Sequence, residues 1–395
     1  MTSVGSRPAV RPTVVLAGVL LISLNLRAGL AAYPALIVAV RRELGISAGT
    51  AGLVQSAALV AMGLGSFAAV RLTLRLGRER AMTAAVVILL AGSALRLVPT
   101  LPALLVGSLS LGVGIGLAGV FLSGLVKEHL AERAGLVTGL YVVAMLLGST
   151  VASQLMVPLS GALGSPTRAL ATLTVPVAVA LAGWLPVAAR TLKPASSAAA
   201  ATAGLPWRSP LARVFAAYMV LSSAQFYGWL TWLAPYFTDR GLSDRSAATL
   251  LSLFSLAQIP AALAFPALAE RRRRWLFWAL VGVAVSLVGA AGVLLWPAGP
   301  LGPWPWVTLI ALGVGAGFPM ALTLVSWKSH TPAEASGATA VGLGVGYLGA
   351  AVAPLLMGVL RDATHSFTAP LLVLVVAAVL MGLLARPYHR VQPDN

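Results

Sequence analysis

Twelve long apolar runs dominate this sequence and constrain its fold more than any other feature. Each run holds at least about 18 residues between charges or clusters of proline and glycine, which is the length that an α-helix needs to cross a bilayer. The runs predict an all-α integral membrane protein with twelve transmembrane helices, at residues 13–38, 48–71, 81–99, 102–126, 135–160, 169–189, 213–237, 246–268, 275–296, 304–326, 337–360 and 369–386.

The composition excludes a water-soluble fold. Only 9% of the residues are charged, whereas soluble domains carry about 25% charged residues. Arg7 and Arg11 precede the first run as in a signal peptide, but the run is too long and no small-residue cleavage site ends it, so a first span is predicted. The chain has no cysteine, which excludes disulfides, thiol catalysis and cysteine-bound metals.

The basic residues predict the orientation in the membrane. The 27 lysines and arginines lie mostly in loops between apolar runs, which indicates membrane topology rather than a nucleic-acid partner. With a cytoplasmic N-terminus, 19 of them lie on the cytoplasmic side, 6 lie outside and 2 lie within spans. The positive-inside rule therefore predicts that both termini are cytoplasmic, and we expect a monomer in the bacterial plasma membrane.

Two halves of the chain resemble each other at an offset of 201 residues. LGVGIG at 111–116 matches LGVGAG at 312–317, and Pro34 matches Pro235. Such a repeat is typical of transporters whose halves are related by an axis along the membrane normal. It predicts an N-terminal six-helix bundle at residues 1–189, a cytoplasmic linker at 190–212 and a C-terminal six-helix bundle at 213–395.

This layout resembles the major facilitator superfamily, with six plus six spans, a linker, and basic loops after spans two and eight. The loop after span two fits part of that superfamily's pattern G-x-x-x-D-R-x-G-R-[RK], at Arg75, Gly77 and Arg78, and Arg80 follows one position beyond its end. Leu74 stands where the pattern has an acid. The resemblance implies the major facilitator fold, in which two pseudo-symmetric bundles enclose a central site.

Four segments more specifically resemble the family of cyanate and 2-nitroimidazole transporters. They are SLNLRAGLAAYPAL at 23–36, GSALRLVP at 92–99, GVGIG at 112–116 and GLVKEHLAERAGLVTGLY at 124–141. The Asn-Leu-Arg segment is the distinctive one, although Ala28 follows it where that family often has proline. This resemblance implies transport of a small anionic or polarised planar solute.

Arg27 is the main candidate for binding such a solute. It lies about fourteen residues into the first span, where a charge costs roughly 2.5 to 3.5 kcal/mol and normally faces a cavity or a partner. All ten acidic residues fall in loops or at span ends, so a bound anion is the expected counter-charge of Arg27. The alternative is a structural role, with the guanidinium bonded to backbone carbonyls. Asn25, about 200° away around the helix, is expected to bond another helix.

Span seven carries polar and aromatic residues at helical spacing, a combination that suits a small planar solute. This stripe comprises Tyr218, Ser222, Gln225, Trp229 and Trp232. For Trp232, and for Tyr236 beyond it, an interfacial aromatic belt is the stronger interpretation. The candidates in other spans are Arg96, Tyr141, Gln258 and Tyr347. The alternative role of Arg96 is snorkelling to the interface, and that of the other three is a hydrogen bond between helices.

Charged residues at the span ends predict two gates that close in turn. The predicted gating residues are Lys127, Glu132, Lys328 and Glu334 on the cytoplasmic side, and Arg42 and Asp239 on the outer side. Solvated surface charge is the alternative interpretation.

Together these features predict a secondary transporter that works by alternating access, with a small solute and the lipid bilayer as its partners. The glycine runs lie inside apolar spans without a following Lys-Ser/Thr, so they indicate close helix packing and not a phosphate loop. The spans carry no catalytic dyad or metal cluster, so we expect neither enzyme activity nor a cofactor. The alternatives are a proton-coupled multidrug or antibiotic exporter of the same superfamily and a non-transporting receptor, and proton coupling is left open.

Overall fold

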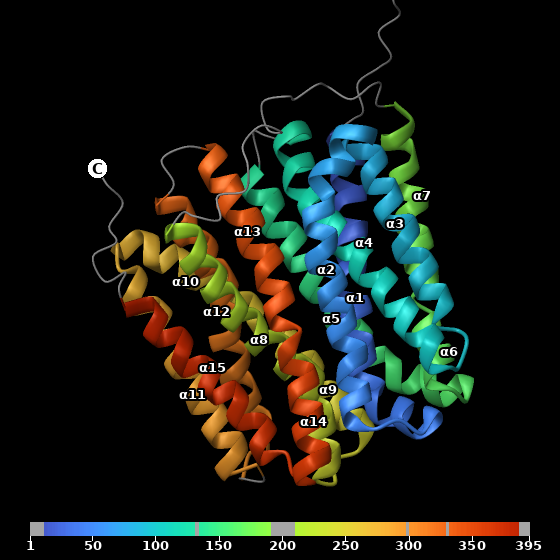
Figure 1. Ribbon diagram of the computed structural model, residues 1–395, viewed down its shortest axis with the longest axis vertical. Helices are drawn as coiled ribbons and strands as arrows, with labels where there is room; N and C mark the ends of the chain where they lie inside the picture. Colours follow the sequence, from blue (N-terminus) through green and yellow to red (C-terminus); the bar gives the residue numbers. More distant parts are fainter. Residues whose placement is uncertain (1–11, 131–133, 191–209, 298–299, 329–331, 387–395) are drawn as a thin grey trace, which may run out of the picture.

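The computed structural model of the protein describes residues 12–130, 134–190, 210–297, 300–328 and 332–386. Throughout this part of the chain the regular structure is helical, as predicted (Figure 1). The helices are α1 (Pro12–Leu44), α2 (Ala48–Leu76), α3 (Arg78–Leu95), α4 (Leu101–His129), α5 (Ala134–Leu163), α6 (Pro166–Ala171), α7 (Thr174–Arg190), α8 (Pro210–Asp239), α9 (Asp244–Leu256), α10 (Gln258–Arg272), α11 (Trp275–Leu295), α12 (Trp304–Lys328), α13 (Pro332–Ala350), α14 (Val352–Thr364) and α15 (Thr368–Ala385).

These helices correspond to the twelve predicted spans, three of which are broken into two helices. Span six consists of α6 and α7, span eight of α9 and α10, and span eleven of α13 and α14. Among the described residues, ten helical segments are long and apolar enough to cross a membrane. The helices α3 and α8 are outside that set, and α3 begins with three charged residues, Arg78, Glu79 and Arg80.

Helices α1–α7 pack together as one bundle, the N lobe, and α8–α15 pack beside it as the C lobe (Figure 1). In the N lobe α1 packs on α5 and α3 on α4, and in the C lobe their repeat counterparts α8 and α13, and α11 and α12, pair in the same way. The terminal end of the molecule is the end where α1 begins, and the distal end is the opposite one, at the bottom of Figure 1. The predicted linker is residues 190–212; its ends lie in helices, since α7 ends at Arg190 and α8 begins at Pro210, and residues 191–209 are outside the described residues.

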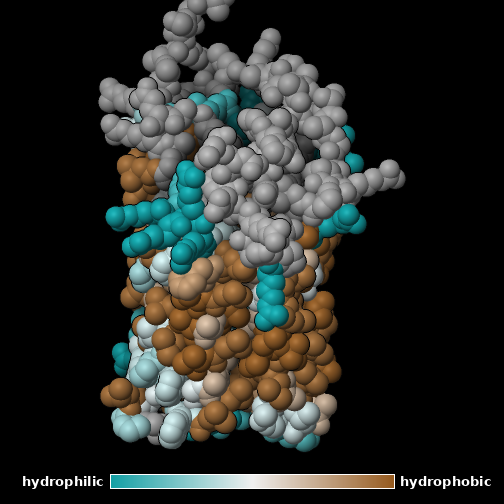
Figure 2. Space-filling model, turned by 90° about the vertical axis from the view of Figure 1, so that its left-hand side faces the viewer, coloured by the Kyte–Doolittle hydropathy of each residue, from teal (hydrophilic) through white to brown (hydrophobic). Residues whose placement is uncertain are grey.

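The outside of the C lobe is apolar, as expected for helices that face lipid. Figure 2 shows hydrophobic side chains over most of this side, with hydrophilic ones gathered towards the terminal end. Leu263, Phe277 and Val288 are each more than half exposed there.

The glycine runs of α4 and α12 allow close helix packing, which confirms the prediction made for them. A Cβ atom on Gly112 would overlap the carbonyl oxygen of Ala58 in α2, and one on Gly313 would overlap that of Gly282 in α11. Membrane helices use small residues in this way to bring their backbones together.

Candidate solute-binding cavity

A cavity lies between the two lobes, near the middle of the helices that line it. The cavity has a volume of about 50 Å³, which is room for several waters or a small solute. Its polar and aromatic lining consists of Arg27 from the N lobe and Ser222, Ser223, Phe226, Tyr227, Gln258, Phe318 and Tyr347 from the C lobe. A solute in this cavity therefore contacts both lobes.

Arg27 supplies the positive charge of the cavity. Its side chain is partly buried, and its Cζ lies 4.4 Å from the centroid of the Phe226 ring, across the lobe interface. A cation–π contact contributes about 0.5 to 2 kcal/mol, which is less than the several kcal/mol that a desolvated ion requires. Arg27 has no carboxylate partner within the described part of the chain. The site therefore has a cation whose counter-charge the described residues do not supply.

Neighbouring helices hold the segment of α1 that follows Arg27. Pro34 has no N–H, so the carbonyl of Leu30 lacks its partner within the helix. The side-chain amide of Gln55 in α2 donates to that carbonyl over 3.4 Å. The Nη1 of Arg96 donates to the carbonyl of Gly29 over 3.1 Å. These two bonds brace α1 from α2 and α3 within one turn of Arg27.

Arg96, the second basic residue predicted within the spans, lies inside the N lobe. It is only 2% exposed, and its Nη2 donates to the Ser108 hydroxyl over 3.0 Å. Its partners are therefore a carbonyl and a hydroxyl of its own lobe, and it neither lines the cavity nor snorkels to the interface. Asn25 bonds another helix, as predicted, because its Nδ2 donates to the carbonyl of Pro176 in α7 over 3.2 Å.

Aromatic rings of the C lobe face Arg27 across the cavity. Phe226 stacks on Phe254 with ring centroids 6.0 Å apart, and Tyr227 meets Tyr347 edge-on at 6.3 Å. The wall offers π faces and hydroxyl groups, a combination that suits a planar polar solute.

The cavity-facing stripe of α8 is rotated by about one residue from the stripe described in the sequence. Ser222 belongs to both, but its neighbours in the cavity are Ser223, Phe226 and Tyr227. One residue corresponds to 100° around a helix, so a shift of one position exposes a different face. Phe226 and Tyr227 are not among the predicted residues, and their signal in the sequence is a spacing of four residues from Ser222 and Ser223.

Three residues of the predicted stripe face the interior of the C lobe. Tyr218 packs against Trp275 with ring centroids 5.9 Å apart. The Nε2 of Gln225 donates to the carbonyl of Leu374 in α15. Trp229 is 1% exposed. None of the three lines the cavity.

Trp232 and Tyr236 do not form an interfacial belt, so that interpretation is wrong. Both are fully buried. The Nε1 of Trp232 donates to the carbonyl of Pro354 over 3.0 Å, and the hydroxyl of Tyr236 donates to that of Val293 over 2.6 Å. The polar atom of each ring has a backbone partner inside the lobe, which permits full burial.

Of the candidates in other spans, Gln258 and Tyr347 line the cavity. The Nε2 of Gln258 donates to the carbonyl of Phe254 over 2.8 Å, which anchors this side chain at the start of α10. Tyr141 packs partly buried against the hydrophobic core and is not part of the cavity lining.

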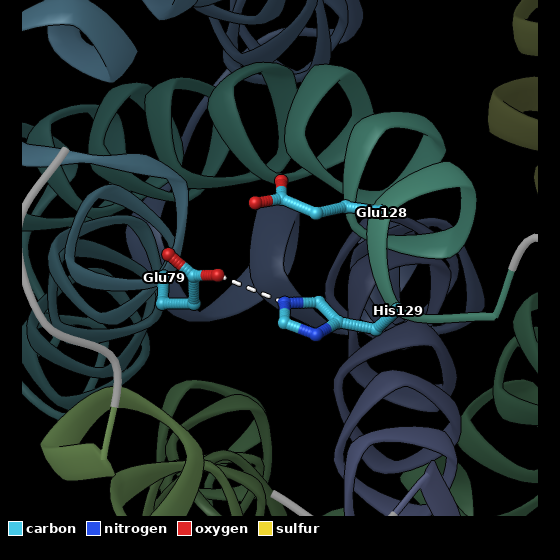
Figure 3. Close-up of side chains that lie close together, drawn as sticks. All are labelled: Glu79, Glu128 and His129. Atoms are coloured by element: carbon cyan, nitrogen blue, oxygen red, sulfur yellow. Dashed lines mark hydrogen bonds and ion pairs between the residues drawn. The ribbon is translucent and has the colours of Figure 1, made fainter. Parts of the chain in front are cut away.

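A cluster of charges joins α3 to α4 at the terminal end of the N lobe. Glu79 pairs with His129 over 2.8 Å, and Arg78 pairs with Glu128. Figure 3 shows Glu79 and His129 pointing towards each other with Glu128 nearby. The hydrogen bond between them lowers the pKa of Glu79 and raises the pKa of His129. The ligand atoms of Glu79, Glu128 and His129 lie within 4.8 Å of one another, but both acids already have basic partners.

The structure places few of the predicted gating residues. The side chains that lie outside the described residues are those of Lys127, Glu132, Lys328 and Glu334. At the distal end Asp239 pairs with Arg361 over 2.7 Å within the C lobe, and Arg42 is exposed at the end of α1. Asp362, which the sequence analysis does not single out for a gate, bonds across the lobes to two N–H groups of α2.

Comparison with known proteins gives matches over most of the chain. The family model described as Major Facilitator Superfamily matches residues 15–354. The chain is 29% identical to the 2-nitroimidazole transporter of Escherichia coli (strain K12), over 94% of each chain. It is 30% identical to the cyanate transport protein CynX of the same bacterium, over 88% of this chain and 90% of CynX. It is 31% identical to the uncharacterized transporter YycB of Bacillus subtilis (strain 168), over 92% and 90% respectively.

Solved structures with low sequence identity share the fold. A bacterial homolog of the human lysosomal transporter Spinster, in an inward-facing and unoccupied conformation, has a TM-score of 0.78 and 15% identity, over 99% of this chain and 100% of that one. The xylose transporter XylE from E. coli, in an inward-open conformation, has a TM-score of 0.75 and 12% identity, over 95% and 96%.

Proposed function

Since the chain belongs to the Major Facilitator Superfamily and is a multi-pass membrane transporter, not an enzyme, we propose that it moves a small anionic or polarised planar solute by alternating access. Cyanate and nitroimidazoles represent the size and chemistry of this solute class. The central cavity between the lobes is its binding site, and Arg27 is the residue that binds its negative pole.

The lone charge of Arg27 carries this proposal. A guanidinium in a membrane-embedded cavity needs a counter-charge, and the described residues offer it only the face of Phe226. Guanidinium binds planar oxyanions and other small anions through two parallel N–H groups, which gives both affinity and orientation. An anion in the cavity would supply the missing charge.

Two further observations support the same class of solute. The opposite wall presents aromatic rings and hydroxyl groups, from Phe226, Tyr227 and Tyr347, which suits a flat polar molecule. The relatives that are 29% and 30% identical are named for transport of 2-nitroimidazole and of cyanate.

We also propose that the terminal end faces the cytoplasm of a bacterial cell and that the protein acts as a monomer. The positive-inside count of the sequence supports this orientation. Green fluorescent protein fused after Asn395 fluoresces in the cytoplasm but not after export through the general secretory route, so fluorescence is the expected result. A dark fusion with full-length expression contradicts the orientation.

A thermal-shift screen of the purified protein tests the proposed function. Sodium cyanate and 2-nitroimidazole are expected to raise the melting temperature of the wild type, because a ligand at 100 times its Kd stabilises by about 2.7 kcal/mol. Arg27→Gln should fold but lose this shift, whereas the matched control Arg42→Gln, at an exposed position, should keep it. A shift of equal size in Arg27→Gln contradicts the proposed site.

A further inference from the structure

Two spans of the C lobe break at about the depth of the cavity, each at an alanine. Span eight is interrupted at Ala257, between α9 and α10, and span eleven at Ala351, between α13 and α14. In Figure 1, α13 stands above α14 along the seam between the lobes. Both alanines keep right-handed helical dihedral angles (φ −67°, ψ −12° and φ −59°, ψ −23°), so each break is a local loss of helical hydrogen bonding in a span that stays helical.

A proline three residues after each break gives the cause. Pro260 and Pro354 each lack the N–H that would bond the carbonyl four residues earlier, and their rings crowd the preceding turn. The 201-residue offset relates them to Leu59 and Ser153. These two residues lie inside α2 and α5, which run unbroken. Pro158 lies inside α5 but leaves that helix unbroken, so among these four related spans only those of the C lobe are interrupted at mid-depth.

Serines of the N lobe bond at both breaks. Ser56 of α2 donates to the carbonyl of Ala351 over 2.5 Å, and the hydroxyl of Ser149 in α5 bonds that of Ser255 over 2.8 Å. The 201-residue offset carries Ser56 onto Ala257 and Ser149 onto Ala350, the residue before Ala351, so each serine corresponds to the break that the other serine bonds. The two contacts are therefore equivalent under the pseudo-symmetry of the lobes.

The half-helices on the distal side of the breaks, α9 and α14, each bond to the N lobe a second time, α14 at the distal end and α9 one turn from its break. Asp362 of α14 accepts hydrogen bonds from the N–H groups of Ala48 and Gly49, over 2.9 and 2.6 Å. These N–H groups form the first turn of α2, where a carboxylate is favoured. Ser252 of α9 donates to the carbonyl of Thr150 in α5 over 3.1 Å. Each half-helix is thus bonded to the N lobe at its break and again beyond it.

Both breaks also adjoin the solute cavity. Gln258 is the first residue after one break and lines the cavity. Tyr347 lines it as well, and its carbonyl accepts the N–H of Ala351 over 3.1 Å at the other break. A solute that contacts these two side chains therefore touches the two points at which the C-lobe spans can bend.

We propose that Gln258 and Tyr347 couple solute binding to a distal gate, which consists of the half-helices α9 and α14 turning about the breaks at Ala257 and Ala351 while α2 and α5 stay straight. Contacts with the N lobe hold this gate closed: Ser149 bonds α9, and the two contacts between α14 and α2, made by Ser56 and Asp362, form the latch. The coupling rests on the proposed function of the cavity, whereas the hinges do not.

Distances between spin labels test the hinges directly, because the chain has no cysteine of its own. One pair, Ala363→Cys with Leu295→Cys, joins the distal ends of α14 and α11 within the C lobe. The reference pair, Leu97→Cys with Leu163→Cys, joins exposed distal positions within the N lobe. Each pair is measured by double electron–electron resonance in nanodiscs, in the full chain with an intact latch and with the latch removed by Asp362→Asn and Ser56→Ala.

Removal of the latch is expected to shift the C-lobe distance and leave the N-lobe distance unchanged. The 13 residues of α14 span about 20 Å, so a turn of roughly 15° at the break moves its end by about 5 Å. Pro354→Ala in the latch-free background should reduce this shift, whereas Pro186→Ala in α7 should not. Asp362→Asn alone gives the same test should the double variant not fold. An unchanged C-lobe distance, or an equal shift in both lobes, overturns the hinges.

Titration with sodium cyanate tests the coupling on the same labelled pairs. Cyanate is expected to change the C-lobe distance in the intact background, and Gln258→Leu and Tyr347→Phe should each reduce that response without preventing the change that latch removal causes. If cyanate binds but the response is the same in these variants, the coupling is wrong. If cyanate does not bind at all while latch removal still moves α14, the proposed solute fails and the hinges stand.

Discussion

The helices α1 and α8 hold equivalent places in the two lobes but supply different chemistry to the cavity. Both carry a proline at the same place in the repeat, Pro34 and Pro235. Arg27 of α1 corresponds to Gly228 of α8, where a Cβ atom would overlap the side chain of Leu374. The two helices therefore share the proline, but only α1 has room for a cationic side chain at this position of the repeat. Charge recognition comes from one lobe, and aromatic and hydroxyl contacts come from the other.

A second difference concerns the spans that meet across the interface. In the N lobe α2 and α5 are continuous, whereas their counterparts in the C lobe break beside Pro260 and Pro354. A continuous helix transmits force along its length, whereas a broken one lets its two halves move separately. The N lobe is thus suited to be the frame and the C lobe the moving part.

The difference in chemistry between the lobes predicts the largest effect. Removing one partner of a desolvated charge pair costs about 2 to 5 kcal/mol, so Arg27→Gln is expected to weaken cyanate binding about 30-fold or more. Tyr347→Phe removes one neutral hydroxyl of the C lobe, and such a hydrogen bond is worth about 0.5 to 1.5 kcal/mol, or roughly 2- to 10-fold. Isothermal titration calorimetry measures both. Equal losses in the two variants would show that the lobes share charge recognition.

Glycine packing tests the feature that the repeat has retained. Gly112→Ala and Gly313→Ala each place a methyl group against a backbone carbonyl of a neighbouring helix. Each is expected to lose about 1 to 3 kcal/mol of stability through overpacking. Gly119→Ala is the matched control in α4. A Cβ atom on Gly119 would have no described atom within 4 Å apart from its sequence neighbours and the backbone of its own helix. Equilibrium unfolding in mixed micelles gives the free energies, and a neutral Gly313→Ala would show that the repeat packing is not preserved.

The pair of Glu79 and His129 gives the N lobe a pH dependence that the C lobe lacks at the equivalent place, where Leu280 corresponds to Glu79. The pKa of His129 is raised above 6.5, so the stability that it contributes is lost as the pH rises through that higher value. The pKa of Glu79 is lowered below 4.5, so its contribution is lost as the pH falls through that lower value. Stability from the pair is therefore greatest between these two values.

Melting temperatures between pH 4 and pH 9 check this dependence. The wild type should lose stability on the alkaline side more steeply than His129→Gln, which keeps a polar side chain without a titration in this range. Parallel profiles for the two proteins would mean that the pair contributes nothing that depends on pH.

The smallest effect is expected from the exposed ion pair of the C lobe. Asp239 and Arg361 are both partly exposed at the distal end, and such pairs contribute about 1 kcal/mol or less and are weakened by salt. Arg361→Gln should therefore change the free energy of unfolding only slightly, with no difference from the wild type at high salt. A loss of several kcal/mol would show that this pair holds α8 and α14 together more strongly than an exposed pair can.

The sequence predicts the parts of this molecule that depend on local pattern. Apolar run lengths give the spans, the 201-residue offset gives the paired helices of the two lobes, and the depth of Arg27 in an apolar run without acids marks it as the candidate site. Each of these follows from the energetic cost of polar groups in a bilayer. The spans, the paired helices and the candidate Arg27 could therefore be predicted without knowledge of the tertiary contacts.

Features that depend on helix rotation or on distant partners could not be predicted in the same way. Phe226 and Tyr227 are adjacent to the predicted stripe, and only the packing of α8 decides which face meets Arg27. Trp232 carries the signature of an interfacial ring but has a carbonyl partner in α14. Asp362 reads as a solvated loop acid, whereas its partners in α2 lie more than 300 residues earlier in the chain.

Anomalous diffraction from crystals soaked with selenocyanate is the most direct test of whether Arg27 binds the anion, because this linear anion carries a selenium atom that can be located without ambiguity. One selenium peak is expected in the central cavity, with the anion between the guanidinium of Arg27 and the aromatic wall of the C lobe. The same soak of Arg27→Gln should give no peak there. A peak at another place, or an equal peak in the variant, would contradict the role of Arg27 as the site that binds the anion.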